Sequence, residues 1–282
     1  MLTGFDHFIV VVNDLNAGIE TYRRLGFDAR AGGEHPAFGS HNALVALGDG
    51  TYIELVAFKD ATLAAKSFWR AGVERLRVSE GLAGFVLGSN DLTNEVAQIA
   101  QRGLMFDAPQ VGARVRPDGQ RVEWHTAMFG GSPVGALPFL IQDDTPRDLR
   151  IEKPREGLGA RLRAKEVVVA VNNLDAERDR YRALLNTEPK HVHNKESDVE
   201  GYRFALEWGS IIVARPTRAG NAMADQLAKR GEGIYALTFG SDTWGIARRE
   251  MKERNIKIEI EPSGFFILPD EACGARIRVT QK

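Results

Sequence analysis

The stretch Ile9-Val10-Val11-Val12-Asn13-Asp14-Leu15-Asn16-Ala17 decides the fold. It returns, shifted by 159 residues, as Val168-Val169-Ala170-Val171-Asn172-Asn173-Leu174-Asp175-Ala176. An apolar, β-branched run that leads into Asn or Asp and then leucine predicts a buried strand followed by a capped helix. Because both copies share one fixed offset, the sequence indicates an internal duplication.

The residues after this stretch predict a β-α-β-β-β unit. Leu15, Ile19, Tyr22 and Leu25 recur at helical spacing, and Gly26 follows at the position where glycine often ends a helix. The remaining strands are predicted at 27–31, 43–47 and 52–58, with a hairpin turn at 48–50.

A second pair of matches appears at an offset of 152 residues. Glu80-Gly81 falls on Glu232-Gly233, and Arg102 falls on Arg254. The unit between the two copies is predicted to hold a helix from 61 to 76, a strand at 82–87, a helix at 91–102, a turn at 117–119, and strands at 122–128 and 138–141. We therefore predict an α+β fold of four tandem βαβββ modules that form two curved mixed sheets with flanking helices.

The chain divides accordingly into residues 1–145, a linker at 146–164, and residues 165–282. The linker holds Pro146, Pro154 and many charged residues, which favours a solvated connection. A basic interaction tail is the alternative, and acidic neighbours argue against it.

Composition excludes several classes of protein. A net charge of −1 and a pI near 6.6 do not fit binding of nucleic acid or an anionic membrane surface. The single cysteine, Cys273, cannot form an internal disulfide and has no histidine partner in sequence that suggests a catalytic thiol. No apolar run approaches the ~20 residues of a membrane span, and residues 1–6 do not resemble a signal peptide. We expect a cytoplasmic protein.

Specific motifs in the first half carry a family resemblance. They are Asp6–Val12, Gly32–Pro36, Gly39–Leu44, Gly48–Leu55, Gly81–Phe85 and Arg116–Gly119. Together with the paired modules, they resemble the glyoxalase-like subgroup of the vicinal oxygen chelate superfamily. Its members include glyoxalase I, extradiol dioxygenases and the bleomycin-type resistance proteins that sequester antibiotics. The resemblance implies that paired modules curve around one cavity.

The resemblance also implies a divalent metal held on the first and fourth strands of a module. His7 and Glu54 match those positions, and imidazole and carboxylate suit Zn, Ni, Mn or Fe. Glu54 is also the predicted catalytic residue, as a general base. The alternatives are a structural histidine at a strand start and an outward-facing glutamate.

The predicted ligand set is incomplete. Counted back from the helix start, Gly84 matches His7 in the second module, and Gln142 stands where a carboxylate is expected. In the duplicated half, Glu166 and Val213 fall on His7 and Glu54. A tight catalytic metal needs at least three protein ligands.

Four further residues are predicted to bind substrate. His35 and Asn42 lie in a glycine-rich connection that lines the pocket mouth in the subgroup, and loop-stabilising hydrogen bonds are the alternative. Trp124 and His125 lie on a later strand, where core packing is the alternative for Trp124.

Three functions stay open at this stage. The first is a metal-dependent lyase, isomerase or dioxygenase that acts on a small oxygen-chelating substrate. The second is a metal-free protein that sequesters a small molecule, and the third is a purely structural or partner-binding duplicate. A monomer or a homodimer fits each of them.

Overall fold

The computed structural model describes residues 1–116, 118–132, 134–194 and 198–282. Its first half consists of two βαβββ modules. Module 1 contains β1 (Leu2–Val11), α1 (Leu15–Arg24), β2 (Ala29–His35), the short helix η1 (Pro36–Phe38), β3 (Ser40–Ala46) and β4 (Tyr52–Phe58). After α2 (Ala61–Ala64) and α3 (Arg70–Val78), module 2 contains β5 (Gly81–Ser89), α4 (Leu92–Gln101), β6 (Gln110–Val115), β7 (Arg121–Ala127) and β8 (Phe139–Asp143).

The second half repeats this order. Following α5 (Arg147–Arg150) and η2 (Gly159–Arg161), module 3 contains β9 (Arg163–Ala170), α6 (Leu174–Leu185), β10 (Lys190–Asn194), β11 (Val199–Leu206) and β12 (Gly209–Pro216). After α7 (Ala222–Arg230), module 4 contains β13 (Gly233–Gly240), α8 (Trp244–Glu253), β14 (Ile258–Glu261), β15 (Gly264–Ile267), η3 (Pro269–Glu271) and β16 (Ile277–Thr280). The predicted four-module α+β fold is confirmed. Strand β6 was not predicted, and the predicted turn at 117–119 includes residue 117, which lies outside the described residues.

Local capping explains why the strand-to-helix pattern repeats. The Asp14 carboxylate accepts a hydrogen bond from the Ala17 amide at 2.9 Å, and the Asn173 side chain accepts one from the Ala176 amide at 3.1 Å. These bonds satisfy backbone donors that the first helical turn leaves free. Gly26 follows α1 with a φ of 91°, a left-handed conformation that glycine adopts without strain.

The first sheet closes into a barrel of order β1-β4-β3-β2-β6-β7-β8-β5. β1 pairs in parallel with β4 and antiparallel with β5, and the pairing of Glu34 with Val115 joins β2 to β6. Side chains alternate along β1. Ile9 and Val11 pack in one core cluster with Trp69 and Val73 of the α2–α3 segment, and this side faces the barrel interior.

The second sheet has the order β10-β11-β12-β9-β13-β16-β15-β14. Among the described residues, β10 and β14 are its two edges and do not pair with each other. The core cluster on one face of this sheet contains Ala170, Ala214 and Met223, the last from α7. The second half is therefore an open counterpart of the first.

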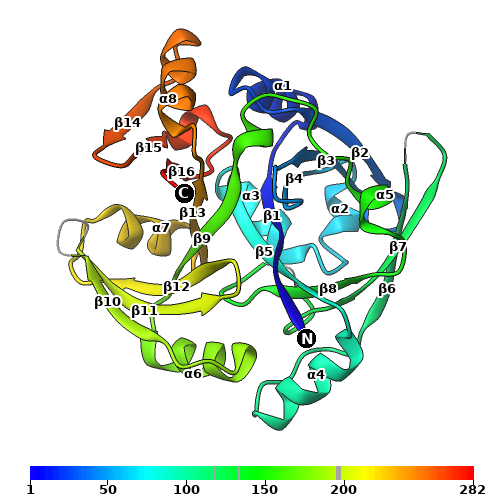
Figure 1. Cartoon of the computed structure of the whole chain (residues 1–282). Coiled ribbons are helices and arrows are strands. Elements are labelled where there is room, and N and C mark those ends of the chain that lie inside the picture. The colour runs from blue at the N-terminus through cyan, green and yellow to red at the C-terminus, as the bar shows by residue number, and fades with distance from the viewer. Residues whose placement is uncertain (117, 133, 195–197) are drawn as a thin grey trace.

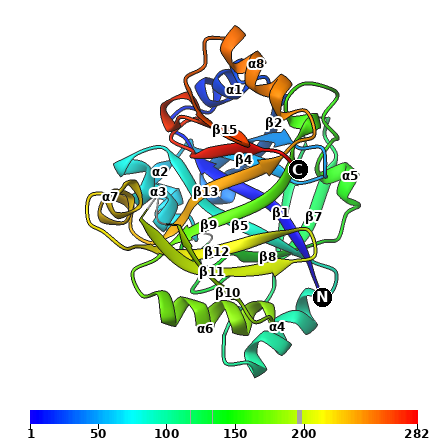
Figure 2. The same cartoon turned by 60° about the vertical axis from the view of Figure 1, so that its left-hand side comes forward.

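The two halves share one hydrophobic core between their sheets. β5 lies against β13, and the rings of Phe8 and Phe239 meet edge to face at 5.9 Å. In both views α1 lies beside α8 and α4 beside α6 (Figures 1 and 2). Arg102 donates to the Ala183 carbonyl at the end of α6, and Arg254 reaches the Arg24 carbonyl at the end of α1. Arg102 and Arg254, which match in the sequence repeat, thus make equivalent contacts across this interface.

The segment 146–164 is not a purely solvated linker, so that expectation is wrong for part of it. Arg150 is 4% exposed and forms ion pairs with Asp6 and Asp143 of the first barrel. Leu158 and Leu162 are buried in the shared core. Burial of these side chains ties the segment to both halves. Across the described residues, no helix combines the length and apolar character that crossing a bilayer requires.

Candidate functional site

The interior face of β1 and β4 brings His7 and Glu54 together. The two strands are parallel, with His7 opposite Tyr52 and Ile9 opposite Glu54. The His7 Nε2 lies 3.3 Å from the Glu54 Oε2, and the two side chains are 3% and 13% exposed. The predicted pair therefore lies inside the barrel, which argues against an outward-facing Glu54.

A continuous chain of buried polar groups runs through this pair. The Asp6 Oδ1 lies 2.6 Å from the His7 Nδ1, and Arg150 donates to the other Asp6 oxygen at 2.7 Å. At the far end, the Asn42 amide donates to the Glu54 Oε1 at 2.6 Å.

Aromatic rings and a second arginine enclose this chain. Tyr52 stacks on the His7 ring with centroids 4.6 Å apart, and its hydroxyl accepts a hydrogen bond from Arg150 at 2.7 Å. Phe139 meets the His7 ring edge-on at 5.7 Å. Arg147 also forms an ion pair with Asp6. The histidine is thus fixed in position by contacts on all sides.

The alternating charges shift the pKa of each group. Burial raises the pKa of Asp6, but Arg150 and the hydrogen bond from His7 outweigh it and hold this pKa well below its usual range. Burial lowers the pKa of His7, but hydrogen bonds to Asp6 and Glu54 raise it overall. Burial raises the pKa of Glu54, while His7 and Asn42 bring it down to about 2. An imidazolium between two carboxylates is therefore favoured.

This electrostatic arrangement limits the chemistry of Glu54. A general base works best when its pKa lies near the working pH. A carboxylate with a pKa of about 2 is ionised but accepts protons poorly. Glu54 is better suited to accept hydrogen bonds from a bound molecule or to stabilise positive charge.

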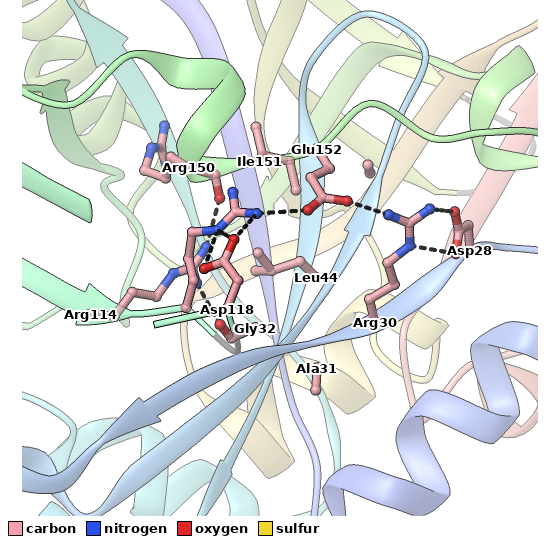
Figure 3. Close-up of a pocket in the computed structure, with 12 residues that line it drawn as sticks. Asp28, Arg30, Ala31, Gly32, Leu44, Arg114, Asp118, Arg150, Ile151 and Glu152 are labelled. Atoms are coloured by element: carbon pink, nitrogen blue, oxygen red, sulfur yellow. Dashed lines mark hydrogen bonds and ion pairs between the residues drawn. The ribbon is translucent and has the colours of Figure 1, made fainter. Parts of the chain in front are cut away.

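A cavity of about 210 Å³ opens on the same interior face. Leu44, which is in register with Glu54 on the neighbouring strand, lines the cavity together with Gly32 and Ala46. A chain of ion pairs lies along its lining, in the order Asp118, Arg116, Glu152, Arg30 and Asp28. Figure 3 shows the Arg30 guanidinium between Glu152 and Asp28. Arg114 and Arg150 are the buried basic residues of its lining.

Most of the predicted substrate-binding residues face this interior. Asn42 is buried and contacts Glu54 directly. His35 lies 3.3 Å from the Ser40 hydroxyl; burial lowers the pKa of His35, and the Glu54 charge opposes that shift. Trp124 packs against the interior core cluster.

His125 does not join these residues. It precedes Thr126 and follows Trp124 on β7, so its side chain points to the opposite face of the strand from Trp124. The His125 Nδ1 contacts the Asp144 carboxylate at 2.8 Å, and its side chain is 37% exposed. His125 therefore lies outside the barrel interior.

The residues of this site do not complete the metal centre that the resemblance implies. His7 and Glu54 are close enough to share an ion, but each already has a partner in the other. Across the described residues, no group of three His, Cys, Asp or Glu side chains could hold a metal. The Asn42 Oδ1 is buried without a hydrogen-bond partner, but a Cβ built on Gly32 would meet it at 2.3 Å, so that oxygen faces Gly32.

Strand register explains why the second module supplies no ligand. β1 and β5 pair so that His7 lies opposite Val86 and Ile9 opposite Gly84, which makes Gly84 the counterpart of His7 as predicted. Val86 then lies opposite Phe139 on β8, as Ile9 lies opposite Glu54 on β4. The counterpart of Glu54 is Phe139 and not Gln142.

Gln142 has a different structural role. Its side-chain oxygen accepts a hydrogen bond from the Leu92 amide at 2.6 Å, at the first turn of α4. In the second half, Glu166 lies opposite Ser210 as His7 lies opposite Tyr52, which confirms that match. The counterpart of Glu54 there is Ile212 and not Val213. The shift arises because five residues separate the paired Ala46 and Tyr52, whereas four separate their counterparts Ala205 and Ser210.

Sequence reasoning missed the residues that surround the predicted pair. Asp6 adjoins His7 in the motif that defines the first strand, and its acidic side chain was a signal for a histidine partner. Arg147 and Arg150 were counted only as charges of a linker. Arg114 interrupts the apolar or small residues of β6, which was the one local sign of an inward-facing charge.

Comparisons with known proteins agree with this fold. The sequence matches none of the curated proteins at a significant level. A hypothetical protein from Staphylococcus aureus has a similar structure, with a TM-score of 0.70 and 14% identity over 99% of each chain. A mutant of 4-hydroxymandelate synthase from Streptomyces coelicolor has a TM-score of 0.63 and 13% identity, over 100% of this chain and 93% of that one.

A shorter similarity exists to methylmalonyl-CoA epimerase from Mycobacterium tuberculosis, with a TM-score of 0.39 and 20% identity. It covers 43% of this chain and 87% of that chain. At their identities, the Staphylococcus aureus protein and the 4-hydroxymandelate synthase mutant show the fold alone. The family model described as a glyoxalase-like domain matches residues 5–185, which is more than half of the chain. The chain therefore belongs to the glyoxalase-like domain family of the vicinal oxygen chelate superfamily.

Proposed function

We propose that the interior of the first barrel binds a small organic molecule with adjacent oxygen atoms, and that Glu54 and Asn42 contact it. The observation that supports this most directly is the cavity of about 210 Å³ lined by Leu44, the residue in register with Glu54 on the neighbouring strand. Ligand sites combine an enclosed space with a few placed polar groups. The volume lies below the ~300–1,000 Å³ of pockets for drug-sized ligands, so it fits a smaller molecule.

In this proposal, the chain's own residues supply the contacts to the ligand. Asp6 and Arg150 hold His7, and His7 holds the Glu54 carboxylate toward the interior. Glu54 can accept hydroxyl donors from the ligand, and Asn42 fixes its second oxygen. Tyr52 and Phe139 shield the His7 ring on two sides. Because these side chains are held in fixed positions, they are suited to bind and orient a small molecule.

A metal-dependent lyase, isomerase or dioxygenase is the second candidate. One observation favours it: the His7 Nε2 and Glu54 Oε2 lie 3.3 Å apart on the first and fourth strands of one module. A Zn, Ni, Mn or Fe ion would have to replace the proton between these atoms. Further ligands would have to come from the bound molecule, because the second module presents Gly84 and Phe139.

The two candidates separate in one experiment. Catechol supplies two adjacent oxygens and is titrated into the protein by calorimetry, with EDTA or with added Zn, Ni, Mn or Fe(II). The variants are Glu54→Gln and, as a matched control outside the barrel, His125→Gln. Metal content is measured in protein purified without chelator or nickel resin.

We expect catechol to bind in EDTA, with about tenfold or greater loss in Glu54→Gln and no loss in His125→Gln. Binding only with added metal, together with one equivalent of metal lost in His7→Ala and Glu54→Ala, would favour the second candidate. No binding of catechol, or of the thiol adduct of a 2-oxoaldehyde, under either condition would overturn both.

We also propose that residues 1–145 and 165–282 are the two domains, that 146–164 connects them, and that the protein is a cytoplasmic monomer or homodimer. The single cysteine supports a reducing compartment. Arg155 lies in an exposed part of the connection, so trypsin should cut after it. Because the core is shared, the fragments should stay together in gel filtration; fragments that separate while folded would contradict a shared core.

A further inference from the structure

The arginines that line the barrel cavity differ in how their charge is balanced. Arg30 forms ion pairs with Asp28 and Glu152, and Arg116 forms them with Asp118 and Glu152. Arg150 forms them with Asp6 and Asp143, which lie on its other side. Each of these three guanidinium groups therefore has two carboxylate partners.

Arg114 has no carboxylate partner among the residues that the structure describes. Its guanidinium donates to the Gly32 carbonyl and, at 2.6 Å, to the Arg150 carbonyl. Both acceptors are neutral, and the residue is only 6% exposed. A buried charge is costly unless an opposite charge compensates it. The two carbonyl bonds hold the side chain in place but supply no ion pair.

Arg114 has more N–H donors than its two carbonyl bonds use. A guanidinium carries five N–H donors in one plane, and the two carbonyl bonds use two of them. Arg114 lines the cavity, as Figure 3 shows, with Gly32 on one side and Arg150 on the other. This planar fork is suited to bidentate contact with a carboxylate.

We propose that Arg114 is the recognition site for a carboxylate group on the molecule bound in the first barrel. The inference rests on the proposed function and narrows its ligand to small organic acids that also carry adjacent oxygens. The acid group would lie against Arg114, and the adjacent oxygens would point toward Glu54 and Asn42. Arg114 then favours molecules with a carboxylate over molecules of similar size that lack one.

The charges of the cavity favour a carboxylate over a phosphate. The lining holds four arginines and three carboxylates, Asp28, Asp118 and Glu152, which leaves one net positive charge. Burial lowers the pKa of Arg114, and Tyr52 and Glu54 partly oppose that shift. A doubly charged phosphate would meet more repulsion from the carboxylates of the lining than a singly charged carboxylate. One guanidinium balances one carboxylate.

Two matched ligands test the proposal. Catechol and 2,3-dihydroxybenzoate carry the same adjacent hydroxyls and differ by one carboxylate. Calorimetry in EDTA should show about tenfold or greater preference of the wild-type protein for 2,3-dihydroxybenzoate, as one charge-assisted contact supplies. The preference should fall below about twofold in Arg114→Met and be intermediate in Arg114→Lys. Arg121→Met, an exposed arginine on the adjoining β7, should retain it.

The outcomes distinguish this inference from the proposed function. If catechol binds but the wild-type protein shows no preference for the carboxylate, the role of Arg114 is overturned and the binding function stands. That result needs no variant, so a misfolded Arg114→Met would not obscure it. If neither molecule binds, the proposed function itself fails. Inorganic phosphate that competes more strongly than acetate would overturn the choice of carboxylate.

Discussion

The two halves of the molecule repeat one pair of modules but arrange it differently. In the first half, β2 meets β6 and the sheet closes around a polar interior. In the second half, the corresponding strands β10 and β14 are the edges of an open sheet among the described residues. The face that would be interior there is covered by Met223 and Leu227 of α7. Duplication therefore preserved the outer core between the sheets and not the inner face.

The contrast is sharpest at related positions. His7, within a buried chain of charges, corresponds to Glu166, which pairs with Arg203 at 2.6 Å and with the Ser210 hydroxyl at 3.1 Å. Glu54 corresponds to Ile212. An apolar residue at that position removes any buried charge that needs compensation. The same backbone can thus hold either a buried polar pair or an apolar residue at these positions. The side chains on the inner face of the strands decide whether a polar site forms.

Of the substitutions considered, Arg150→Met should lower the unfolding free energy most. This substitution would remove the buried cation that pairs with both Asp6 and Asp143, and would leave them only the more exposed Arg147 as an arginine partner. Loss of one partner of a buried ion pair costs about 3–5 kcal/mol. Urea unfolding of the variant and the wild-type protein measures this loss.

The double variant Asp6→Asn, Arg150→Met serves as the control. It removes the stranded charge and should be more stable than Arg150→Met alone. A loss below about 1 kcal/mol for Arg150→Met would show that water or another cation already compensates Asp6.

The pH dependence of stability should separate His7 from the other histidines. The pKa of His7 is raised in the folded protein by Asp6 and Glu54, despite the lowering effect of burial. Its stabilising contribution is therefore complete below its ordinary pKa of ~6.5 and is lost as pH rises through the folded pKa. The pKa of His35 and of His41 is lowered by burial, so their contributions have the opposite sign.

Comparison with His7→Gln isolates this contribution, because His35 and His41 are present in both proteins and cancel. The difference in unfolding free energy between wild type and variant should be largest below pH 6.5 and shrink above it. Toward low pH, wild-type stability should also fall once the Glu54 carboxylate, with a pKa near 2 in the fold, is protonated in the unfolded chain below ~4.5. A difference that grows above pH 6.5 would contradict the buried imidazolium.

The repeated modules were predictable because their signals are local. Asp14 and Asn173 each accept a hydrogen bond from the amide three residues later, so the capping pattern survives in both copies of the sequence. The closure of one sheet was not predictable in the same way. It depends on Glu34 meeting Val115, two residues that are far apart in sequence and whose pairing no short pattern specifies.

The site was predictable only in part for the same reason. His7 and Glu54 could be paired because each is a polar residue at a fixed place in its strand. The partners Arg150 and Arg114 lie far along the chain and reach the interior only after the barrel closes. Gln142 was mistaken for a ligand position because the true counterpart, Phe139, depends on the register between β5 and β8.

Filling the space beside Asn42 should disturb the first half to a smaller degree. A Cβ on Gly32 would meet the Asn42 Oδ1 at 2.3 Å and the Leu44 Cγ at 3.0 Å. Gly32→Ala should therefore displace Asn42 from Glu54 and cost about 1–3 kcal/mol through overpacking. Urea unfolding reports the loss, and catechol titration reports the disturbed site.

Gly245 in the second half is the matched control. It lies in α8, and a Cβ there would meet nothing within 4 Å. Gly245→Ala should raise stability by about 0.5–1 kcal/mol, because alanine loses less backbone freedom in a helix. Equal effects of the two substitutions would contradict tight packing at Asn42.

The smallest effect is expected where the second half replaces the histidine. Glu166 pairs with Arg203, whose side chain is 44% exposed, and exposed pairs contribute about 0–1 kcal/mol. Glu166→Gln should therefore change the unfolding free energy by less than about 1 kcal/mol and leave catechol binding unchanged. Its related substitution in the first half, His7→Gln, should weaken that binding, since His7 holds Glu54. If Glu166→Gln instead reduced binding, the two inner faces would be coupled through the shared core, and the open sheet would be part of the site.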